Sequence, residues 1–434
     1  RQMCIRDRFI SNPERSTWQA LTQRPTADFS SIEPIVDEVF AAVRSNGDAA
    51  VRKYSQKFDA YTPDQLMVAA QALANAKGEL SAELVAAIDV AYENIYRFHE
   101  AQKTAPVRLD TQEGVSCWQE KKPIEKVGIY IPGGTAPLFS TVLMLAIPAQ
   151  LAGCRQIVLC TPPNKSGVPA AIRYAAQKCG VTLVAQIGGI QAIAALTYGT
   201  ERIPKVYKIF GPGNQFVTVA KQMATQYQTA IDMPAGPSEL LVVADSTAKP
   251  AYVAADLLSQ AEHGKDSQVI LVSTSEQIIP QVQAELEKQL LVLPRKEIAA
   301  TALENSLAVY FDDEQAALDF INEYGPEHYI TCVENENVFV DGIINAGSVF
   351  IGNYTPESAG DYASGTNHTL PTNGYTKQYS GVNLDAFLKA ITYQRISAQG
   401  IRSLGPHIEA MAAAEGLDAH KNAVSLRLKD LNNG

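Results

Sequence analysis

The chain has 434 residues, a formal net charge of −10, and 19% charged and 46% hydrophobic residues. A single hydrophobic core stops growing at roughly 250–300 residues, so this length predicts two or three domains. The negative charge argues against a nucleic-acid-binding protein, because that function needs a basic face. The composition is typical of a soluble globular protein that acts on small molecules.

Neither the cysteines nor the apolar segments indicate export or a membrane location. The six cysteines are scattered without a CxxC pair, which favours reduced thiols in the cytoplasm over a disulfide framework. The longest apolar stretch, residues 137–152, is interrupted by polar residues and is shorter than the ~20 residues of a membrane span. The opening RQMCIRDR has no apolar core, so we do not expect a signal peptide. We therefore predict a cytoplasmic protein.

The first hundred residues have the periodicity of helices. In residues 31–44 the apolar side chains recur with a period near 3.6, and Gly47 lies just beyond them. This pattern predicts an amphipathic helix that is ended by the glycine. A second long helix is expected from about Ser81 to Lys103.

Short β-branched runs then alternate with helical segments in two series. Continuous apolar strands separated by helices are typical of parallel sheets that are covered on both faces. The two series predict two doubly wound α/β lobes and suggest an old duplication, although no sequence repeat is visible. The predicted strands are residues 127–132, 156–160, 182–187 and 205–210 in the first series, and 240–245, 268–273, 307–312, 329–333 and 348–352 in the second.

Residues 353–381 are rich in Gly, Ser, Thr, Asn and Pro and show no periodicity. A segment of this length inside a compact protein is usually functional or disordered. Its aromatic, Asp and His residues favour a functional segment. Residues 383–431 return to helical periodicity and are predicted to form a separate helical tail.

Four of the six histidines lie in positions that suit ligand binding. We expect the other two, His99 and His407, on the surface, because one lies on a charged helix and the other at a helix start. The four lie at segment ends or in the polar segment, and three of them closely follow a carboxylate or amide side chain. These four are His263 three residues after Gln260, His328 directly after Glu327, His368 in SGTNH, and His420 five residues after Glu415.

A metal site and plain capping or surface roles both remain open for these histidines on spacing alone. Loops that follow parallel strands are where α/β folds place ligands. Imidazole, carboxylate and amide donors without a thiolate would suit zinc. The HExxH motif is absent, which argues against a zinc peptidase of that type.

The evidence for nucleotide binding is a set of glycine turns that follow predicted strands. Residues 211–216, GPGNQF, follow a strand and open a helix, as an anion-binding turn does, but Phe216 replaces the third glycine of GxGxxG. Residues 131–137 and 187–192 form similar turns, and all three could be ordinary tight turns. Asp232 lies about 20 residues downstream, but the fingerprint is too incomplete to assign it to a ribose.

Several long motifs resemble those of the histidinol dehydrogenase family. The likeness covers nearly the whole chain after the first ~20 residues, and the longest motif is highly specific. The motifs are residues 231–263 (IDMPAGPSELLVVADSTAKPAYVAADLLSQAEH), 130–134 (YIPGG), 210–217 (FGPGNQFV), 324–328 (YGPEH), 357–372 (ESAGDYASGTNHTLPT) and 419–424 (AHKNAV).

The resemblance implies which residues carry the chemistry. Glu327 and His328 would form the acid–base pair, with His328 taking the alcohol proton and Glu327 activating water. One zinc ion per subunit would be bound by Gln260, His263, Asp361 and His420 of the partner subunit.

The resemblance also implies the substrate and its contacts. L-Histidinol would be oxidised through the aldehyde to L-histidine by two NAD⁺. The NAD⁺ contacts would be Tyr130, Gln191 and Asn214. The substrate contacts would be Ser238, Gln260, His263, His328, Asp361, His368, Glu415 and His420.

The fold that we expect is α/β, with two Rossmann-like doubly wound lobes of incomplete dinucleotide-binding type and a small helical C-terminal tail. The resemblance implies a homodimer in which this tail reaches the partner subunit. We divide the chain into an N-terminal segment (1–24), a first lobe (25–125 and 237–382), an NAD-binding second lobe (126–236) and the tail (383–434).

Two alternatives compete with a dehydrogenase. A zinc hydrolase could use the same ligands without NAD⁺, and its glycine turns would then be merely structural. A two-lobed small-molecule binding protein would have no use for the Glu327–His328 pair, and such proteins are usually exported.

Overall fold

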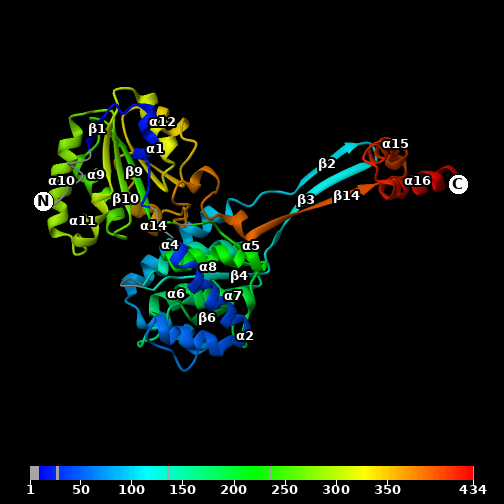
Figure 1. Cartoon of the computed structure of the whole chain (residues 1–434), viewed down its shortest axis with the longest axis horizontal. Helices are drawn as coiled ribbons and strands as arrows, with labels where there is room; N and C mark the ends of the chain where they lie inside the picture. Colours follow the sequence, from blue (N-terminus) through cyan, green and yellow to red (C-terminus); the bar gives the residue numbers. More distant parts are fainter. Residues whose placement is uncertain (1–8, 26–28, 134–136, 235, 434) are drawn as a thin grey trace. The chain divides into compact units, whose positions relative to one another are not determined.

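The computed structural model divides into two compact units (Figure 1). The larger unit contains Arg1–Gln102 and Glu125–Ala386, and the smaller contains Lys103–Ile124 and Phe387–Gly434. The larger unit holds two parallel sheets, and the smaller holds one antiparallel sheet. The structure describes residues 9–25, 29–133, 137–234 and 236–433.

One lobe of the larger unit is built on a five-stranded parallel sheet. Its spatial order is β6-β5-β4-β7-β8, which is 3-2-1-4-5 in chain order and matches the first five strands of a Rossmann sheet. All four strands of the first predicted series are therefore present. The strands are β4 (Lys126–Tyr130), β5 (Gln156–Thr161), β6 (Leu183–Gln186), β7 (Lys208–Phe210) and β8 (Ala230–Ile231).

Helices cover this sheet on both faces, and the most apolar one is buried on all sides. That helix is α5, whose residues from Ser140 to Ala149 are all buried, as expected for the 137–152 stretch. No helix within the described ranges is long and apolar enough to cross a membrane. The covering helices include α5 (Phe139–Ala152), α6 (Ala170–Lys178), α7 (Gly189–Tyr198) and α8 (Gln215–Ala224).

The second lobe is built on a six-stranded parallel sheet in the order β1-β11-β10-β9-β12-β13. Without β1, this order is again 3-2-1-4-5, so the two lobes share one topology, as a duplication would produce. The strands are β1 (Phe9–Ser11), β9 (Glu239–Ala244), β10 (Gln268–Ser273), β11 (Leu307–Tyr310), β12 (His328–Cys332) and β13 (Ser348–Ile351).

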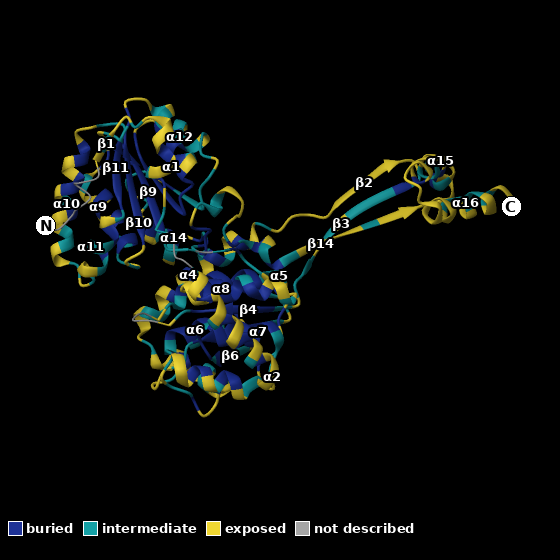
Figure 2. Cartoon of the chain, in the orientation of Figure 1, coloured by how far each residue is buried: buried dark blue, intermediate teal, exposed yellow. Residues whose placement is uncertain are grey.

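Alternate residues of each central strand pack against different helices. Leu240 and Val242 lie in the cluster with α9, α10 and α11, whereas Leu241 and Val243 lie in the cluster with α1, α12 and α13. Both faces are therefore apolar, and the central strands β9, β10 and β12 are buried throughout (Figure 2). The helices are α1 (Trp18–Leu21), α9 (Pro250–Ala261), α10 (Ile278–Val292), α11 (Lys296–Glu304), α12 (Glu314–Tyr324) and α13 (Glu336–Asp341).

The domain boundaries predicted for the N-terminal part are wrong in two respects. Residues 9–24 are not a separate segment, because β1 pairs with β11 and Trp18 packs edge-on against Phe311 and Phe320. Residues 1–8 lie outside the described residues. Helix α2 (Glu33–Phe58) belongs to the five-stranded lobe, since its apolar stripe is buried against α7.

The predicted helix boundaries near the N-terminus are largely confirmed. Gly47 has a φ of +50° and interrupts α2, so that one helical piece ends there and another continues to Phe58. The second long helix is α4 (Ala82–Glu100), whose N-terminus is capped by the Ser81 hydroxyl. Helix α3 (Ala70–Asn75) lies between the two.

The smaller unit differs from the predicted all-helical tail. Strand β14 (Leu388–Ile396) pairs with β3 (Val115–Pro123), which also pairs with β2 (Val107–Gln112), so residues 103–124 join the tail and not the first lobe. Trp118 and Tyr393 stack across the two longer strands with ring centroids 5.2 Å apart. Two antiparallel-packed helices follow, α15 (Ala398–Ala414) and α16 (Asp418–Asn433).

The polar segment 353–381 is ordered by one short helix and by its own turns. Helix α14 (Glu357–Tyr362) was not predicted, because it is too short to show periodicity. The rest of the segment contributes Asn373 and Tyr375 to the wall of the cavity described below. The segment therefore forms part of the cavity wall.

Candidate active site

A cavity of about 590 Å³ in the larger unit brings together residues from both of its lobes. This volume lies within the usual range of a small-molecule site. From the five-stranded lobe it receives Pro212, Gly213 and Asn214, and from the other lobe it receives most of the predicted polar residues. Those residues are Ser238, Gln260, His263, Glu327, His328, Asp361 and His368.

The two lobes present opposite edges of their sheets to this cavity. The GPGN turn follows β7, at the carboxyl edge where α/β folds usually bind ligands. Glu327 and His328, however, lie at the start of β12, and Ser238 directly precedes β9. The general rule that α/β folds place ligands in loops after strands therefore does not hold for the six-stranded lobe, whose site lies at the amino edge.

Glu327 and His328 are both buried and converge, although they are neighbours in the chain. Nδ1 of His328 lies 3.6 Å from Oε2 of Glu327 and 3.2 Å from the carbonyl oxygen of Glu239. Because a carbonyl only accepts, Nδ1 carries the proton in that hydrogen bond, and Nε2 of the neutral ring is left as the basic atom. Nε2 has no hydrogen-bond partner among the residues that the structure describes.

Three buried or half-buried carboxyl groups surround this imidazole. Oε1 of Glu357 lies 3.9 Å from Nδ1, and Oδ1 of Asp361 lies 3.6 Å from Nε2. Burial opposes an imidazolium, but the charges of Glu357 and Glu327 raise the pKa of His328 well above its usual value. Burial raises the pKa of Glu327, and it raises the pKa of Glu357 to about 8. An excess of acidic groups at this depth favours a bound cation.

The donors around this cluster fit a metal ion. His328, Glu357 and Asp361 offer ligand atoms that lie within 4.8 Å of one another. Gln260 and His263 at the end of α9 also line the cavity, and burial lowers the pKa of His263, which favours the neutral imidazole that binds metals. The geometry alone thus permits two ligand sets, which share Asp361.

His368 is held by two polar contacts to the protein. Its Nδ1 lies 2.8 Å from the carbonyl oxygen of Asp361, and its Nε2 lies 3.2 Å from the hydroxyl of Thr141. Burial lowers the pKa of His368. A direct contact between its Nε2 and a substrate would replace the Thr141 contact.

The GPGN turn is built as a rigid platform in front of α8. Gly211 has a φ of +124°, and a side chain there would collide with the carbonyl oxygen of Tyr130. Asn214 caps α8 by accepting a hydrogen bond from the Val217 N–H. Asp232 accepts from the Gly211 N–H at 2.7 Å and pairs with Lys221 at 2.5 Å, so it stabilises the turn and is not free to bind a ribose.

Tyr130 and Gln191 lie at the glycine turn formed by residues 187–192, and both are buried. The Gly189 N–H donates to the hydroxyl of Tyr130 at 3.1 Å. Gln191 donates to Asp59 at 3.0 Å, and its own side-chain oxygen has no partner within the described ranges. These two residues are not part of the cavity wall, unlike Asn214. Of the glycine turn formed by residues 131–137, residues 134–136 lie outside the described residues.

The structure does not bring every predicted residue to the cavity. Glu415 ends α15 and His420 lies on α16, both in the smaller unit, and both are exposed. His407 is exposed as expected. The prediction that His99 is on the surface is wrong, because its ring is fully buried and contacts the Ile95 carbonyl and the Asn367 amide.

None of the cysteines that the structure describes lines the cavity. The five cysteines that the structure describes are free, and Cys4 lies outside the described residues. Burial raises the pKa of Cys154 to about 12 and raises that of Cys160 further, which makes both thiols poor nucleophiles.

Three residues at the site were missed from the sequence. Glu357 stands four residues before Asp361, a spacing that places both on one face of a helix, and this signal was available. Glu239 and Arg24 form a buried ion pair behind Glu327. Nothing in the sequence links them, because they are 215 positions apart.

A sequence model described as histidinol dehydrogenase matches residues 22–428 of this chain. The chain belongs to the histidinol dehydrogenase family. Histidinol dehydrogenase from Bacteroides thetaiotaomicron is 55% identical over 425 residues, which are 98% of this chain and 99% of that protein. Chloroplastic histidinol dehydrogenase from Arabidopsis thaliana is 50% identical over 97% of this chain and 91% of its own length.

Solved structures agree with this assignment. The crystal structure of histidinol dehydrogenase from Elizabethkingia anophelis matches with a TM-score of 0.95 and 54% identity, covering 98% of each chain. The histidinol dehydrogenase family consists of NAD-dependent oxidoreductases, so the predicted enzyme class is confirmed. The matches give no support to the alternative of a zinc hydrolase.

Proposed function

We propose that this protein oxidises L-histidinol through L-histidinaldehyde to L-histidine with two NAD⁺. The observation that carries the proposal is the buried Glu327–His328 pair, which opens on the same cavity as the GPGN turn. A cavity that receives a base from one lobe and a nucleotide-type turn from the other is suited to hydride transfer. A hydrolase would need the pair but not the turn.

We further propose that zinc is bound by Gln260, His263, Asp361 and His420 of the partner subunit. A bound zinc ion would orient the imidazole and amine of the substrate and stabilise negative charge on its oxygen. The neutral state favoured for His263 supports its role as a ligand. A cation bound beside Asp361 would favour the ionised form of Glu357, whose pKa is raised by burial, and this carboxylate would then strengthen binding of the cation.

His328 is proposed as the base of the first oxidation. Removal of a hydride from an alcohol requires loss of the hydroxyl proton, and NAD⁺ is the hydride acceptor. A cation bound beside Asp361 would offset the negative charge that raises the pKa of His328 and so favour its neutral form. The Glu239 carbonyl would then hold the remaining proton on Nδ1, so that Nε2 can accept the alcohol proton. His328 need not bind metal for this role.

Glu327 is proposed to act in the second oxidation, where water must add to the aldehyde. Its Oε2 accepts a hydrogen bond from the Glu239 N–H at 2.8 Å, which holds the carboxylate in place. The other oxygen is then available to take a proton from water. Ser238, His368 and Glu415 are proposed as further substrate contacts.

The NAD⁺ contacts proposed are Tyr130, Gln191 and Asn214. The unpartnered oxygen of Gln191 and the rigid GPGN turn support this placement. The partner that we propose is a second copy of the chain, and the location is the cytoplasm, where the five free cysteines would stay reduced.

NADH formation from L-histidinol tests the proposal. If one site performs both oxidations, each histidinol consumed should give two NADH without accumulation of aldehyde. Removal of the metal by a chelator should abolish both oxidations. One NADH per histidinol with trapped aldehyde would contradict the four-electron reaction. Turnover of a hydrolysable substrate without NAD⁺ would favour the hydrolase instead.

A further inference from the structure

The backbone of a single residue, Glu239 at the start of β9, contacts both members of the proposed acid–base pair through its N–H and its carbonyl oxygen. Its N–H donates to Oε2 of Glu327 at 2.8 Å, and its carbonyl oxygen lies 3.2 Å from Nδ1 of His328. The same N–H lies 3.0 Å from the side-chain oxygen of Gln260, when the amide nitrogen of that residue faces Glu357. The two peptide groups that flank the Cα of Glu239 therefore hold both side chains.

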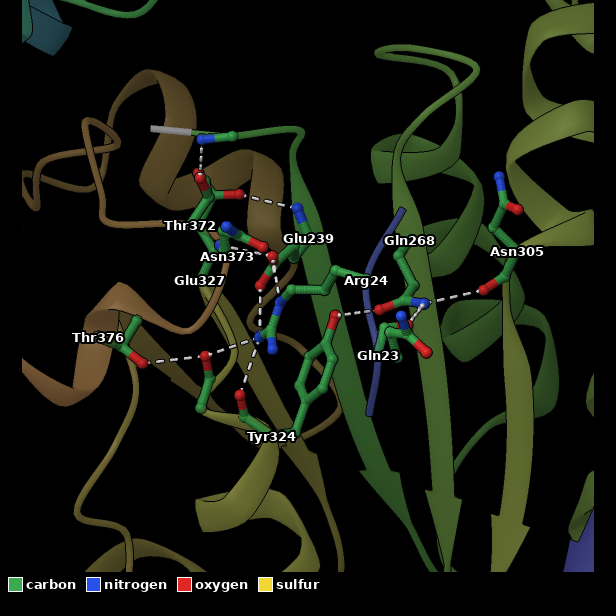
Figure 3. A network of polar contacts seen from close by, with 12 residues as sticks. Gln23, Arg24, Glu239, Gln268, Asn305, Tyr324, Glu327, Thr372, Asn373 and Thr376 are labelled. Carbon is green, nitrogen blue, oxygen red and sulfur yellow. Dashed lines mark hydrogen bonds and ion pairs between the residues drawn. The ribbon is translucent and has the colours of Figure 1, made fainter. Parts of the chain in front are cut away.

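Arg24 holds the side chain of Glu239 through two hydrogen bonds (Figure 3). Nε and Nη2 of Arg24 donate to the two carboxylate oxygens at 2.5 and 2.9 Å, which is a bidentate pair. The Asn373 N–H donates to the same carboxylate at 2.6 Å. The side chains of Arg24 and Glu239 are 11% and 2% exposed, so solvent hardly screens the pair.

Arg24 also holds the turn that leads into Glu327. Its Nη2 donates to the carbonyl oxygens of Tyr324 and Gly325, at 2.8 and 3.2 Å, where helix α12 ends. Its guanidinium lies 3.9 Å from the centroid of the Tyr324 ring. A cation is favourable beside the last carbonyl groups of a helix, which have no partner within the helix. Glu327 follows Gly325 by two residues. Arg24 therefore binds both the turn that leads to Glu327 and the side chain of Glu239.

We infer that Arg24 and Glu239 are positioning residues for the acid–base pair. A buried ion pair does not by itself add stability, because desolvation offsets the attraction. The Arg24–Glu239 ion pair lies between the backbone of β9 and the turn before Glu327, so its effect is on the positions of these groups. It fixes the distance between Glu327, His328 and the Glu239 peptide. The inference rests on the proposed function, since that function assigns proton transfer to Glu327 and His328.

The test is the double variant Arg24→Gln/Glu239→Gln, which removes both charges and leaves neither buried alone. We expect kcat for L-histidinol oxidation to fall by about 10- to 100-fold, as for other residues that orient catalytic groups. KM and the affinity for L-histidinol measured by calorimetry should change much less, since neither residue lines the cavity. General loss of structure would instead weaken binding and turnover together.

A matched control is Arg173→Gln/Glu79→Gln. This pair is also bidentate, at 2.9 and 2.5 Å, but it is more exposed, and the other hydrogen bonds of Arg173 reach the Val168 and Ala72 carbonyls instead of the turn before Glu327. Its kcat should equal that of the wild type. If the Arg24/Glu239 double variant does not fold, Arg24→Lys makes the same comparison, because lysine keeps the charge but cannot form the two parallel bonds. We expect its kcat to lie between those of the double variant and the wild type.

Two results would overturn the inference and are distinguishable. If the wild type forms NADH from L-histidinol and the folded Arg24/Glu239 variants share its kcat, the positioning role is wrong and the proposed function stands. If the wild type forms no NADH from L-histidinol, the proposed function is wrong, and the positioning role is wrong with it.

Discussion

Oε2 of Glu327 lies 3.6 Å from Nδ1 of His328, although adjacent residues of a strand normally point to opposite faces. The convergence is possible because only His328 belongs to β12, whereas Glu327 leaves the turn formed by Gly325 and Pro326. Gly325 has a φ of +63°, a left-handed conformation that favours glycine. This irregular turn makes one carboxylate and one imidazole available at the same point.

The first prediction separates the two ligand sets that the geometry permits. His263→Asn should lose zinc and activity together, because a ligand is removed. His328→Gln should keep zinc but lose activity by about 10²- to 10⁴-fold, the usual effect of removing a general base. Zinc is measured by mass spectrometry alongside turnover.

His407→Asn, which changes an exposed histidine, is the control and should resemble the wild type. Loss of zinc from His328→Gln, with zinc retained in His263→Asn, would identify His328 as a ligand beside Glu357 and Asp361.

The second prediction separates Glu327 from His328. Glu327→Gln should slow the oxidation of supplied histidinal by about 10²-fold or more, because only this step needs an activated water. Hydride transfer from histidinol should be affected much less. Glutamine can still accept the Glu239 N–H, so the variant changes the charge more than the position. Single-turnover measurements of both half-reactions decide the matter, and equal losses would remove the water-activating role.

The sequence predicted those parts of the fold in which burial leaves a one-dimensional pattern. Every strand of the two predicted series is present, because both faces of each parallel sheet are covered and the runs are continuously apolar. Strand β2 is exposed at every residue and β14 is mostly exposed, so neither shows an apolar run. Helical periodicity around 383–431 therefore concealed β14, and the pairing of β14 with β3 depends on residues more than 250 positions apart.

The same limit applies to the site. Gln260 and His263 were predicted together because a spacing of three residues is visible in the chain. The contact between Glu239 and Arg24 depends on how β9 and the N-terminal segment pack, which no local spacing records. The prediction that His99 is exposed relied on the charged residues elsewhere on its helix. In the folded protein the face of the helix that carries His99 is buried.

The third prediction concerns Asp256 on α9, where burial raises the pKa of the carboxyl group to about 7. The folded state then binds a proton that the unfolded state releases, so the unfolding free energy falls as the pH rises from about 4 through 7. Asp256→Asn should abolish this loss. One pKa unit corresponds to about 1.4 kcal/mol, and partial screening still leaves an expected gain of about 1 kcal/mol or more at pH 8.

Thermal unfolding midpoints of the Asp256→Asn variant and the wild type, measured between pH 5 and 8, provide the check. The two midpoints should converge toward pH 5 and separate toward pH 8. Asp312→Asn, which changes an exposed carboxyl group in the same lobe, should show no such divergence. A constant difference across this range would mean that Asp256 does not titrate there.

The last prediction is that each active site is shared between two subunits. The smaller unit carries Glu415 and His420 on exposed surfaces, and α16 has no buried residue. Met411, Leu417 and Leu426 also remain exposed on its two helices and the loop between them. Apolar side chains in such a position need a neighbour, and a twofold partner can cover them reciprocally.

Co-expression of His263→Ala with His420→Ala tests this sharing. In a mixed dimer one site collects both lesions and the other collects none, so random pairing should restore roughly a quarter of the wild-type activity. The matched control is co-expression of His263→Ala with His328→Ala, two residues of the larger unit. Every site of that mixed dimer carries one lesion, and the mixture should stay inactive. If His420 instead served its own subunit, the first mixture would be as inactive as the second, because no mixed dimer would then contain an intact site.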